Sequence, residues 1–482
     1  MRPSPRSLAL ITAGLLLGVP AGLLIARMTG WGQGRESVTT AAVFQDVLSA
    51  IRTRFVDSLS EEDLYAKAAK GVVSTLGDPY SAFLGPAELR SYRNLLYGRG
   101  RTAGLTLTTG PAGLRVAAVI PNSPADRAGL KPGDLLVSIG SRPVRSLSAA
   151  EAQHLLPTDT STVPIRIQSP GDFTPVAVGL TAERMQVPAV SVAERLSDSV
   201  GYVALRAMSD HAADEVRAAL GRLRARQLHS LVLDLRGNRG GQLDEALAIA
   251  DIFLKPGQRI AMVRKRNLLW GYSATHAASY PDLKLVLLVD HWTASSAEIV
   301  AAALRDNGRA LLVGERTFGK GLIQTTIPLG DSAAIRLTTG RWTGPGGRLI
   351  SGGIAPDSAV TPEPWEASLR RSLGFRAEPL ARTLIGIAGR ERAAGVPLDS
   401  VRLMPNDREQ IRTTLRAAGL TLSRRTMERQ ADLFQNDLRI LSAAGRDSAA
   451  ATIRFGLLAD PVVRAGLAVL PRPVPPPAPP NR

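Results

Sequence analysis

An apolar run and a glycine-rich loop meet in the stretch Leu231-Val232-Leu233-Asp234-Leu235-Arg236-Gly237-Asn238-Arg239-Gly240-Gly241. A helical apolar pattern follows this loop through Leu247 to Phe253. The same order returns farther along, where the apolar run Leu285 to Val289 leads by a short turn into the helical pattern Ala297 to Leu304. Repeated strand–turn–helix units predict a largely parallel, buried sheet with helices packed against it.

The segments outside this α/β region have other patterns. Residues 36 to about 97 favour helices, and short β-type runs separated by turn residues occupy about 99–185, the size of a small β-domain. After Pro364 the pattern is helical again, and the last twelve residues are rich in proline and predicted to be extended. One late helix is predicted with a narrow apolar seam, which would pack on its own domain rather than on a second chain: Met427, Ala431, Phe434, Leu438 and Leu441.

Composition excludes several classes of site and partner. The chain of 482 residues has no cysteine, which excludes disulfides, thiolate zinc sites and a cysteine nucleophile. Its net charge of +17 is of the kind that often signals nucleic acid or anionic lipid. However, 52 of the 59 basic residues are arginines and they are dispersed along the chain. We therefore expect no nucleic-acid partner.

The N-terminus carries a hydrophobic segment. Arg2 and Arg6 precede an uncharged stretch from Leu8 to Ala26, which as a helix would span roughly 28 Å, close to the hydrocarbon thickness of a bilayer. This length favours a signal anchor with its basic end in the cytoplasm, and a cleaved signal peptide is the alternative. Under either interpretation the working domains face the periplasm or the cell exterior.

Three loops carry side chains or amides suited to catalysis. Ser295 lies at a predicted helix N-terminus, where free amides and the helix dipole favour a developing oxyanion. The glycines of loop 236–241 allow amides to point into a cleft. Lys320 lies between two glycines, and in an extended strand it shares a face with Gln324, whose amide can hold the amine. Taken singly, each loop could also be an ordinary turn, an N-cap serine or a solvated lysine.

Two other catalytic arrangements fit the sequence less well. His291 lies four residues before Ser295, so a serine–histidine pair is conceivable, but no G-x-S-x-G turn surrounds the serine. A zinc site is weaker still, because the chain has no H-E-x-x-H motif and no cysteine. A lysine at position 320 in so arginine-rich a chain also argues against a merely solvated side chain, since arginine stays protonated and cannot replace a lysine base.

Five segments occur together in a characteristic order: Asp78 to Leu84, Asp234 to Gly241, Thr293 to Ile299, Phe318 to Gln324 and Gly352 to Asp357. Over about residues 40 to 361 these segments resemble those of the carboxyl-terminal processing peptidases, also called tail-specific proteases. The 25-residue separation of nucleophile and lysine in that family selects Ser295 rather than Ser296, since Lys320 follows Ser295 by that distance.

The resemblance implies a serine–lysine dyad. Ser295 would be the nucleophile, Lys320 the general base and Gln324 the residue that orients the lysine amine. The backbone amides of Gly241 and Ser296 would form the oxyanion hole. The family needs no metal, nucleotide or other cofactor, so none is expected here.

The resemblance also identifies the β-rich region as a PDZ domain. The amides of Gly104, Leu105 and Thr106 would bind the terminal carboxylate of a substrate, while its tail adds a strand to the sheet edge. The family otherwise leaves open whether the protein forms a homo-oligomer or needs an adaptor. The helical region after about residue 365 lies outside the resemblance and has no predicted function.

The resulting prediction is an α/β multidomain protein, with a PDZ β-module inserted between an N-terminal helical segment and an α/β peptidase core. It would be a serine endopeptidase of the bacterial cell envelope, anchored in the inner membrane, that binds apolar C-terminal tails of protein substrates. The alternatives are a PDZ scaffold that binds tails without cutting and a protein that binds nucleic acid or lipid.

The predicted parts are an anchor or signal peptide (1–30), a helical segment (31–98), the PDZ domain (99–185), the peptidase core (186–362), a helical extension (363–470) and a proline-rich tail (471–482).

Overall fold

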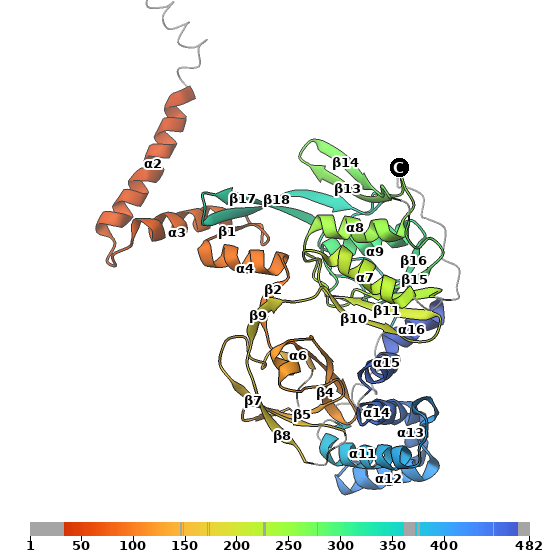
Figure 1. The fold of residues 1–482 in the computed structure, drawn as a ribbon. Coiled ribbons are helices and arrows are strands. Elements are labelled where there is room, and N and C mark those ends of the chain that lie inside the picture. Colours follow the sequence, from red (N-terminus) through yellow and green to blue (C-terminus); the bar gives the residue numbers. More distant parts are fainter. Residues whose placement is uncertain are drawn as a thin grey trace, which may run out of the picture. The chain divides into compact units, whose positions relative to one another are not determined.

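The computed structural model describes residues 33–144, 147, 149–170, 172, 174–224, 228–276, 278–360, 372–373, 376–446 and 448–470. The chain divides into two compact units, one of Met1–Gly85 with Thr326–Leu337 and the other of Pro86–Thr325 with Thr338–Arg482 (Figure 1). The predicted anchor and the proline-rich tail lie outside the described residues. Among those that are described, no helix combines the length and apolarity needed to cross a bilayer.

The first unit is built from helices α2 (Gln33–Arg54) and α3 (Glu61–Ser74) and the short strand β1 (Ala82–Leu84). The Ser60 side chain accepts a hydrogen bond from the Asp63 amide and so caps the start of α3. Strand β1 pairs antiparallel with residues 334–336 of strand β18 (Ala333–Thr343).

A six-stranded, mostly parallel sheet forms the centre of the second unit, as the strand–turn–helix units predict. Its first two strands are antiparallel, and every later pair is parallel, so the carboxyl ends of these strands meet at one edge. The order along the sheet is β10 (Val190–Arg195), β11 (Val200–Leu205), β12 (Ser230–Asp234), β15 (Lys284–Val289), β16 (Ala310–Gly314) and β19 (Ser358–Ala359).

Helices cover both faces of this sheet. Leu231 and Leu233 belong to the core formed with α7 (Ala212–Arg224), α8 (Leu243–Phe253) and α9 (Ser296–Asp306). Val232, whose side chain points to the opposite face, belongs to a second core with Val463 and Val469. Those two residues lie on α16 (Pro461–Val469), so the C-terminal region supplies a layer of the α/β core (Figure 1).

A second group of strands flanks the α/β core. Strand β13 (Arg259–Lys265) pairs antiparallel with β14 (Leu268–Ser273) and, at its far end, with residues 341–343 of β18. Strand β17 (Leu322–Leu329) precedes β18 and pairs with it. Trp342 is fully buried where β18 joins the core.

The β-module has its own sheet and core. Its sheet has the order β3 (Leu105–Gly110), β4 (Gly113–Val119), β5 (Leu135–Ile139), β7 (Val163–Gln168) and β8 (Val176–Leu180), with β6 (Arg142–Pro143) beside β5. Two short helices, α5 (Pro124–Arg127) and α6 (Ala149–Gln153), complete it. The chain enters and leaves through a two-stranded ribbon of β2 (Arg99–Thr102) and β9 (Glu183–Gln186), and α4 (Pro86–Leu96) precedes the ribbon. Strand β3 lies at the edge of the module's sheet.

The C-terminal region contributes further helices: α11 (Ala377–Ala393), η1 (Leu398–Ser400), α12 (Pro405–Ala417), α13 (Arg424–Arg429), α14 (Ala431–Ala444) and α15 (Ala449–Ala459). The prediction of one continuous helix with an apolar seam is wrong, because the backbone of Gln430 leaves the helical region at φ −103° and ψ 7° and separates α13 from α14. Met427, Phe434, Leu438 and Leu441 are nevertheless buried in the core of these helices, as expected for a seam that packs on its own domain.

Candidate active site

Ser295 occupies a sharp turn between strand β15 and helix α9. Its backbone has φ 57° and ψ −125°, a conformation that costs a residue with a side chain about 1–3 kcal/mol. The preceding turn is organised by the Asp290 carboxylate, which accepts hydrogen bonds from the amides of Trp292 at 3.0 Å and Thr293 at 2.9 Å. Ser295 itself is only half-buried. The turn therefore holds a strained serine at the start of a helix and within reach of a ligand.

The carboxylate of Glu298 connects the serine turn to the lysine loop. Oε2 accepts hydrogen bonds from the amide of Ser295 at 2.8 Å and from the amide of Lys320 at 2.9 Å. Oε1 accepts from the amide of Gly319 at 2.8 Å and from the hydroxyl of Thr317 at 2.6 Å. One side chain thus fixes the backbone of the predicted nucleophile and of the predicted base at the same time.

Glu298 is completely buried, and this affects its titration. Burial raises the pKa of Glu298 above its ordinary value, against the opposing effect of the four hydrogen bonds that its carboxylate accepts. Protonation would turn one of the accepting carboxylate oxygens into an O–H donor, which would then face the N–H and O–H groups that donate to it. The arrangement around Ser295 and Lys320 therefore requires the ionised form.

The lysine loop is held from both sides. The amide of Phe318 donates to the carbonyl of Thr293 at 3.0 Å, and the indole Nε1 of Trp342 donates to the carbonyl of Lys320 at 3.1 Å. Lys320 is half-buried in this position. The Nε2 of Gln324 donates to Thr338 Oγ1 at 3.5 Å, and its predicted contact with the lysine amine stays a prediction.

The glycine-rich loop after β12 approaches the serine closely. A Cβ on Gly240 would lie 2.9 Å from the Ser295 Cβ and 3.0 Å from the Ser296 amide nitrogen. Gly241 forms a parallel bridge with Met208, in which the flanking residues 240 and 242 make the hydrogen bonds and the Gly241 amide points away. The Ser296 amide belongs to the first helical turn, which geometry leaves without intrahelical acceptors. These are the two amides predicted for the oxyanion hole.

A buried carboxylate and its arginine partners lie next to this loop. Asp234 is fully buried and pairs with Arg206 at 3.1 Å and with Arg236 at 2.8 Å, while the hydroxyl of Tyr202 donates to it at 2.5 Å. Burial alone would raise the pKa of Asp234, but the two guanidinium groups hold it well below the ordinary value. Arg236 also pairs at 2.9 Å with Asp460, the N-cap of α16. The C-terminal region therefore supplies the second carboxylate that balances these two partly exposed cations.

Glu298 and Thr317 have no role among the predicted site residues. Glu298 follows Ser295 by three residues, which is the spacing of a capping box, so its bond to the Ser295 amide had a signal in the sequence. The hydrogen bonds that Glu298 accepts from Gly319, Lys320 and Thr317 had no signal in the sequence. His291, considered as a partner for the serine, instead makes an exposed pair with Glu315 at 2.8 Å.

The residues predicted to bind a tail carboxylate lie at the start of β3. The Gly104 amide donates to Thr102 Oγ1 at 3.0 Å, and the Gly104 carbonyl accepts from Ile120 at 2.7 Å. Leu105 is opposite Val119 and Thr106 is opposite Ala118 in the ladder with β4. Their role in binding a carboxylate stays a prediction.

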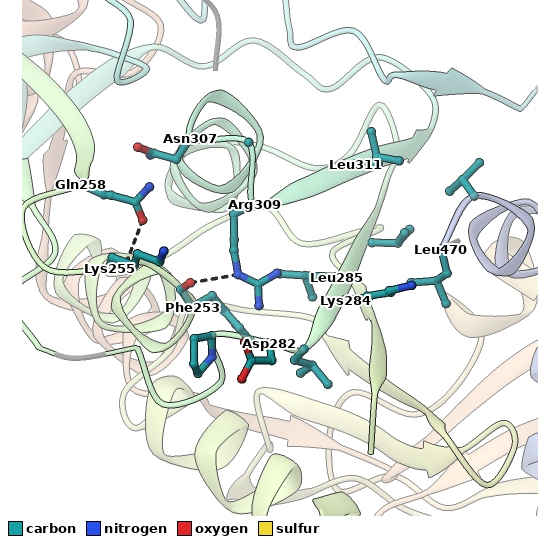
Figure 2. A pocket seen from close by; sticks show the side chains of 15 residues that line it. Phe253, Lys255, Gln258, Asp282, Lys284, Leu285, Asn307, Arg309, Leu311 and Leu470 are labelled. Atoms are coloured by element: carbon teal, nitrogen blue, oxygen red, sulfur yellow. Dashed lines mark hydrogen bonds between the residues drawn. The ribbon is translucent and has the colours of Figure 1, made fainter. Parts of the chain in front are cut away.

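A cavity lies at the other edge of the central sheet, at the amino ends of β15 and β16 (Figure 2). Its wall includes Arg309, whose Nε donates to the carbonyl of Phe253 at 3.1 Å, together with Lys284 and Leu470. None of the predicted site residues lines it. Within the part of the chain that the structure describes, no cluster of acidic and histidine side chains is suited to hold a metal ion.

Comparison with known proteins is consistent with the geometry of the serine and lysine loops. A model of the peptidase family S41 matches residues 199–360, and a PDZ domain model matches residues 115–168. A carboxyl-terminal-processing protease of Picosynechococcus is 34% identical over 321 residues, which cover 65% of this chain and 77% of that protein. The chain belongs to peptidase family S41.

Other relatives agree with this assignment. A carboxy-terminal-processing protease of Bartonella bacilliformis is 29% identical over 363 residues, covering 74% of this chain and 82% of that protein. The carboxy-terminal processing protease CtpB of Bacillus subtilis is 28% identical over 376 residues, covering 73% and 77%. This S41 peptidase is a serine protease of the carboxyl-terminal-processing group, and its β-module is a PDZ domain.

Proposed function

We propose that this S41 peptidase hydrolyses proteins that present an apolar C-terminal tail, with Ser295 as nucleophile and Lys320 as general base. The observation that carries the proposal is the shared hydrogen bonding of Glu298, because one carboxylate binds the amides of both residues. Two loops distant in sequence are thereby held at one place, with a strained serine at a helix N-terminus. The PDZ domain supplies the site for the tail.

The chemistry follows from these positions. Ser295 Oγ attacks the scissile carbonyl carbon while its proton passes to the uncharged amine of Lys320. The carbonyl oxygen becomes an oxyanion, which accepts hydrogen bonds from the amides of Gly241 and Ser296. Collapse expels the amine of the leaving peptide, which takes the proton back from Lys320. A water molecule then repeats the attack on the acyl-enzyme with the same base, and Ser295 is released.

Gln324 would hold the Lys320 amine in the direction of Ser295. The Nε2 of Gln324 donates to Thr338 Oγ1 at 3.5 Å, so its carbonyl oxygen is the atom that would accept from the lysine. The charge state that the reaction needs is the uncharged amine.

We place the enzyme in the bacterial cell envelope, anchored in the inner membrane. The support is the uncharged stretch from Leu8 to Ala26 behind Arg2 and Arg6, which has the length of one bilayer crossing. Digestion of intact spheroplasts with an added protease would test this. Degradation of the peptidase domain without lysis is expected, and complete protection until lysis would contradict the location.

The catalytic proposal is tested by incubating the full chain with an unfolded protein that ends in apolar residues and reading the products by mass spectrometry. Ser295→Ala and Lys320→Ala should abolish cleavage, and Lys320→Arg should do so as well, because arginine keeps the charge but cannot act as a base. Lys284→Ala, which removes an exposed lysine at the opposite edge of the sheet, is the matched control and should cleave normally.

The outcomes separate the candidates. Cleavage retained in both alanine variants at the site would refute the dyad. Tail binding without cleavage by any form, the control included, would favour a PDZ scaffold.

A further inference from the structure

The open edge of the PDZ sheet is not free in this structure. Strand β3 pairs with β4 on one side only, and its outer side is the edge of the sheet. The Gly104 carbonyl accepts a hydrogen bond from the amide of Ile120, the residue that follows β4. Residues alternate along a strand, so Leu105 and Leu107 direct their amide and carbonyl groups to the outer side. These are the groups to which an added peptide strand must bond.

The side chain of Gln153 occupies both of those positions. Its Nε2 donates to the carbonyl of Leu105 at 3.1 Å, and its Oε1 accepts from the amide of Leu107 at 3.2 Å. A carboxamide carries the same donor and acceptor as a peptide group, so Gln153 satisfies the edge as a bound backbone would. A single side chain therefore takes the place of the segment of tail that would lie beside Leu105 and Leu107.

We propose that Gln153 closes the tail-binding edge of the empty PDZ domain and that a substrate tail binds by displacing it. The inference rests on the proposed function, in which this domain receives the tail. A tail then has to supply a free amide and a free carbonyl at the register of Leu105 and Leu107. Extended termini without proline there meet this demand, and folded or helical termini do not.

The position of Gln153 makes the exchange local. It is the last residue of the short helix α6, and its side chain is exposed to solvent. Its neighbour Ala152 is completely buried in the core of the module and holds the helix in place. The glutamine side chain can therefore swing away from β3 without moving the core. The edge of β3 then loses two hydrogen bonds to Gln153 and gains two to the tail. Closure by Gln153 therefore lowers the affinity for the tail without preventing binding.

The test compares tail affinity in full-length variants that all carry Ser295→Ala, so that the ligand stays intact. The probe is a fluorescent peptide of about ten residues that ends in Val-Ala-Val with a free carboxylate, and the same peptide with an amidated end is the specificity control. Gln153→Ala removes the competitor and should bind about two- to tenfold more tightly, because two modest hydrogen bonds are offset by the entropy of fixing one long side chain. His154→Ala, the adjacent exposed residue, is the matched variant and should bind as the parent does.

Amide hydrogen exchange of β3 supplies a readout that needs no ligand. In the empty protein the Leu107 amide should exchange faster in Gln153→Ala than in the parent, while His154→Ala leaves it unchanged. Equal or weaker peptide binding by Gln153→Ala, or unchanged exchange at Leu107, would overturn the proposal. Faster exchange with no peptide binding by any variant would instead refute the tail-binding role of the PDZ domain and leave the closed edge established.

Discussion

Replacing Glu298 by glutamine keeps the shape of the side chain and removes its charge and one of its two acceptor oxygens. The remaining carbonyl oxygen keeps the most hydrogen bonds when it accepts from the amides of Ser295 and Lys320. The new amino group then faces the Thr317 hydroxyl, which can rotate and accept, and the Gly319 amide, which cannot. The Gly319 amide loses its acceptor. The hydrogen bonds from the amides of Ser295 and Lys320 change from a charged to a neutral acceptor.

The energetic cost follows from these changes. A buried N–H without a partner costs about 1–3 kcal/mol, and each bond that changes from a charged to a neutral acceptor loses roughly 1 kcal/mol. We therefore expect Glu298→Gln to lower the free energy of unfolding by about 3–5 kcal/mol. Catalysis should suffer as well, since a misplacement of about 1 Å between reacting groups can cost about a hundredfold in rate.

The assay measures kcat and KM with an unfolded protein substrate, together with urea unfolding of the same preparations. Asp407→Asn is the matched control, because Asp407 is a buried carboxylate at the corresponding N-terminal position of α12. It accepts a hydrogen bond from the Met404 amide at 3.0 Å and pairs with Arg390 away from the active site. The control should lose stability and keep its kcat.

In Glu298→Gln, kcat should fall at least a hundredfold, with the affinity for the tail unchanged. A kcat within about threefold of the parent, in a variant as destabilised as the control, would refute the reasoning. The carboxylate would then be a structural cap of α9 and nothing more.

Three further expectations concern the glycine-rich loop and its support. Gly241→Ala brings a Cβ into a clash with the carbonyl oxygen of Met208, so it should lower both the stability and kcat. A normal kcat would contradict the close approach that we assign to this loop. Asp460→Asn leaves Arg236 with one carboxylate and should cost about 1 kcal/mol in urea unfolding and about two- to tenfold in kcat, whereas an unchanged kcat would limit Asp460 to a cap of α16. Asp234→Asn should destabilise the protein by about 3–5 kcal/mol at pH 7. Because the folded-state pKa of Asp234 is depressed, this difference should be complete above about pH 4 and shrink as the pH falls further, and a difference that is independent of pH would refute the pairing.

Much of the fold was accessible from local patterns. The runs before Arg236 and Asp290 form buried parallel strands, and the helices that follow them begin within a residue or a few residues of the expected positions. Strands β5 and β7 of the PDZ domain lie within the predicted β-rich region of about 99–185. These elements were predictable because alternation, turn residues and helix signals lie within a few residues of one another.

The division of the helix at Gln430 was not predictable in this way. Apolar spacing continues across the break, since Met427 and Phe434 are both buried. The apolar pattern indicates which residues face the core, but it does not indicate whether the backbone between them stays helical. Packing of α13 and α14 against neighbouring helices decides that.

The sequence by itself determined the family and the order of the domains, and it singled out Ser295 and Lys320 as the predicted nucleophile and base, because each of these is written in a contiguous segment. Only the tertiary structure decided how these segments are joined. Glu298 meets its partners from the lysine loop, Asp460 reaches Arg236, α16 covers the second face of the sheet and Gln153 closes the edge of β3. Each of these contacts links residues far apart along the chain, and a local pattern can mark a residue as buried or polar without stating which distant group it will meet.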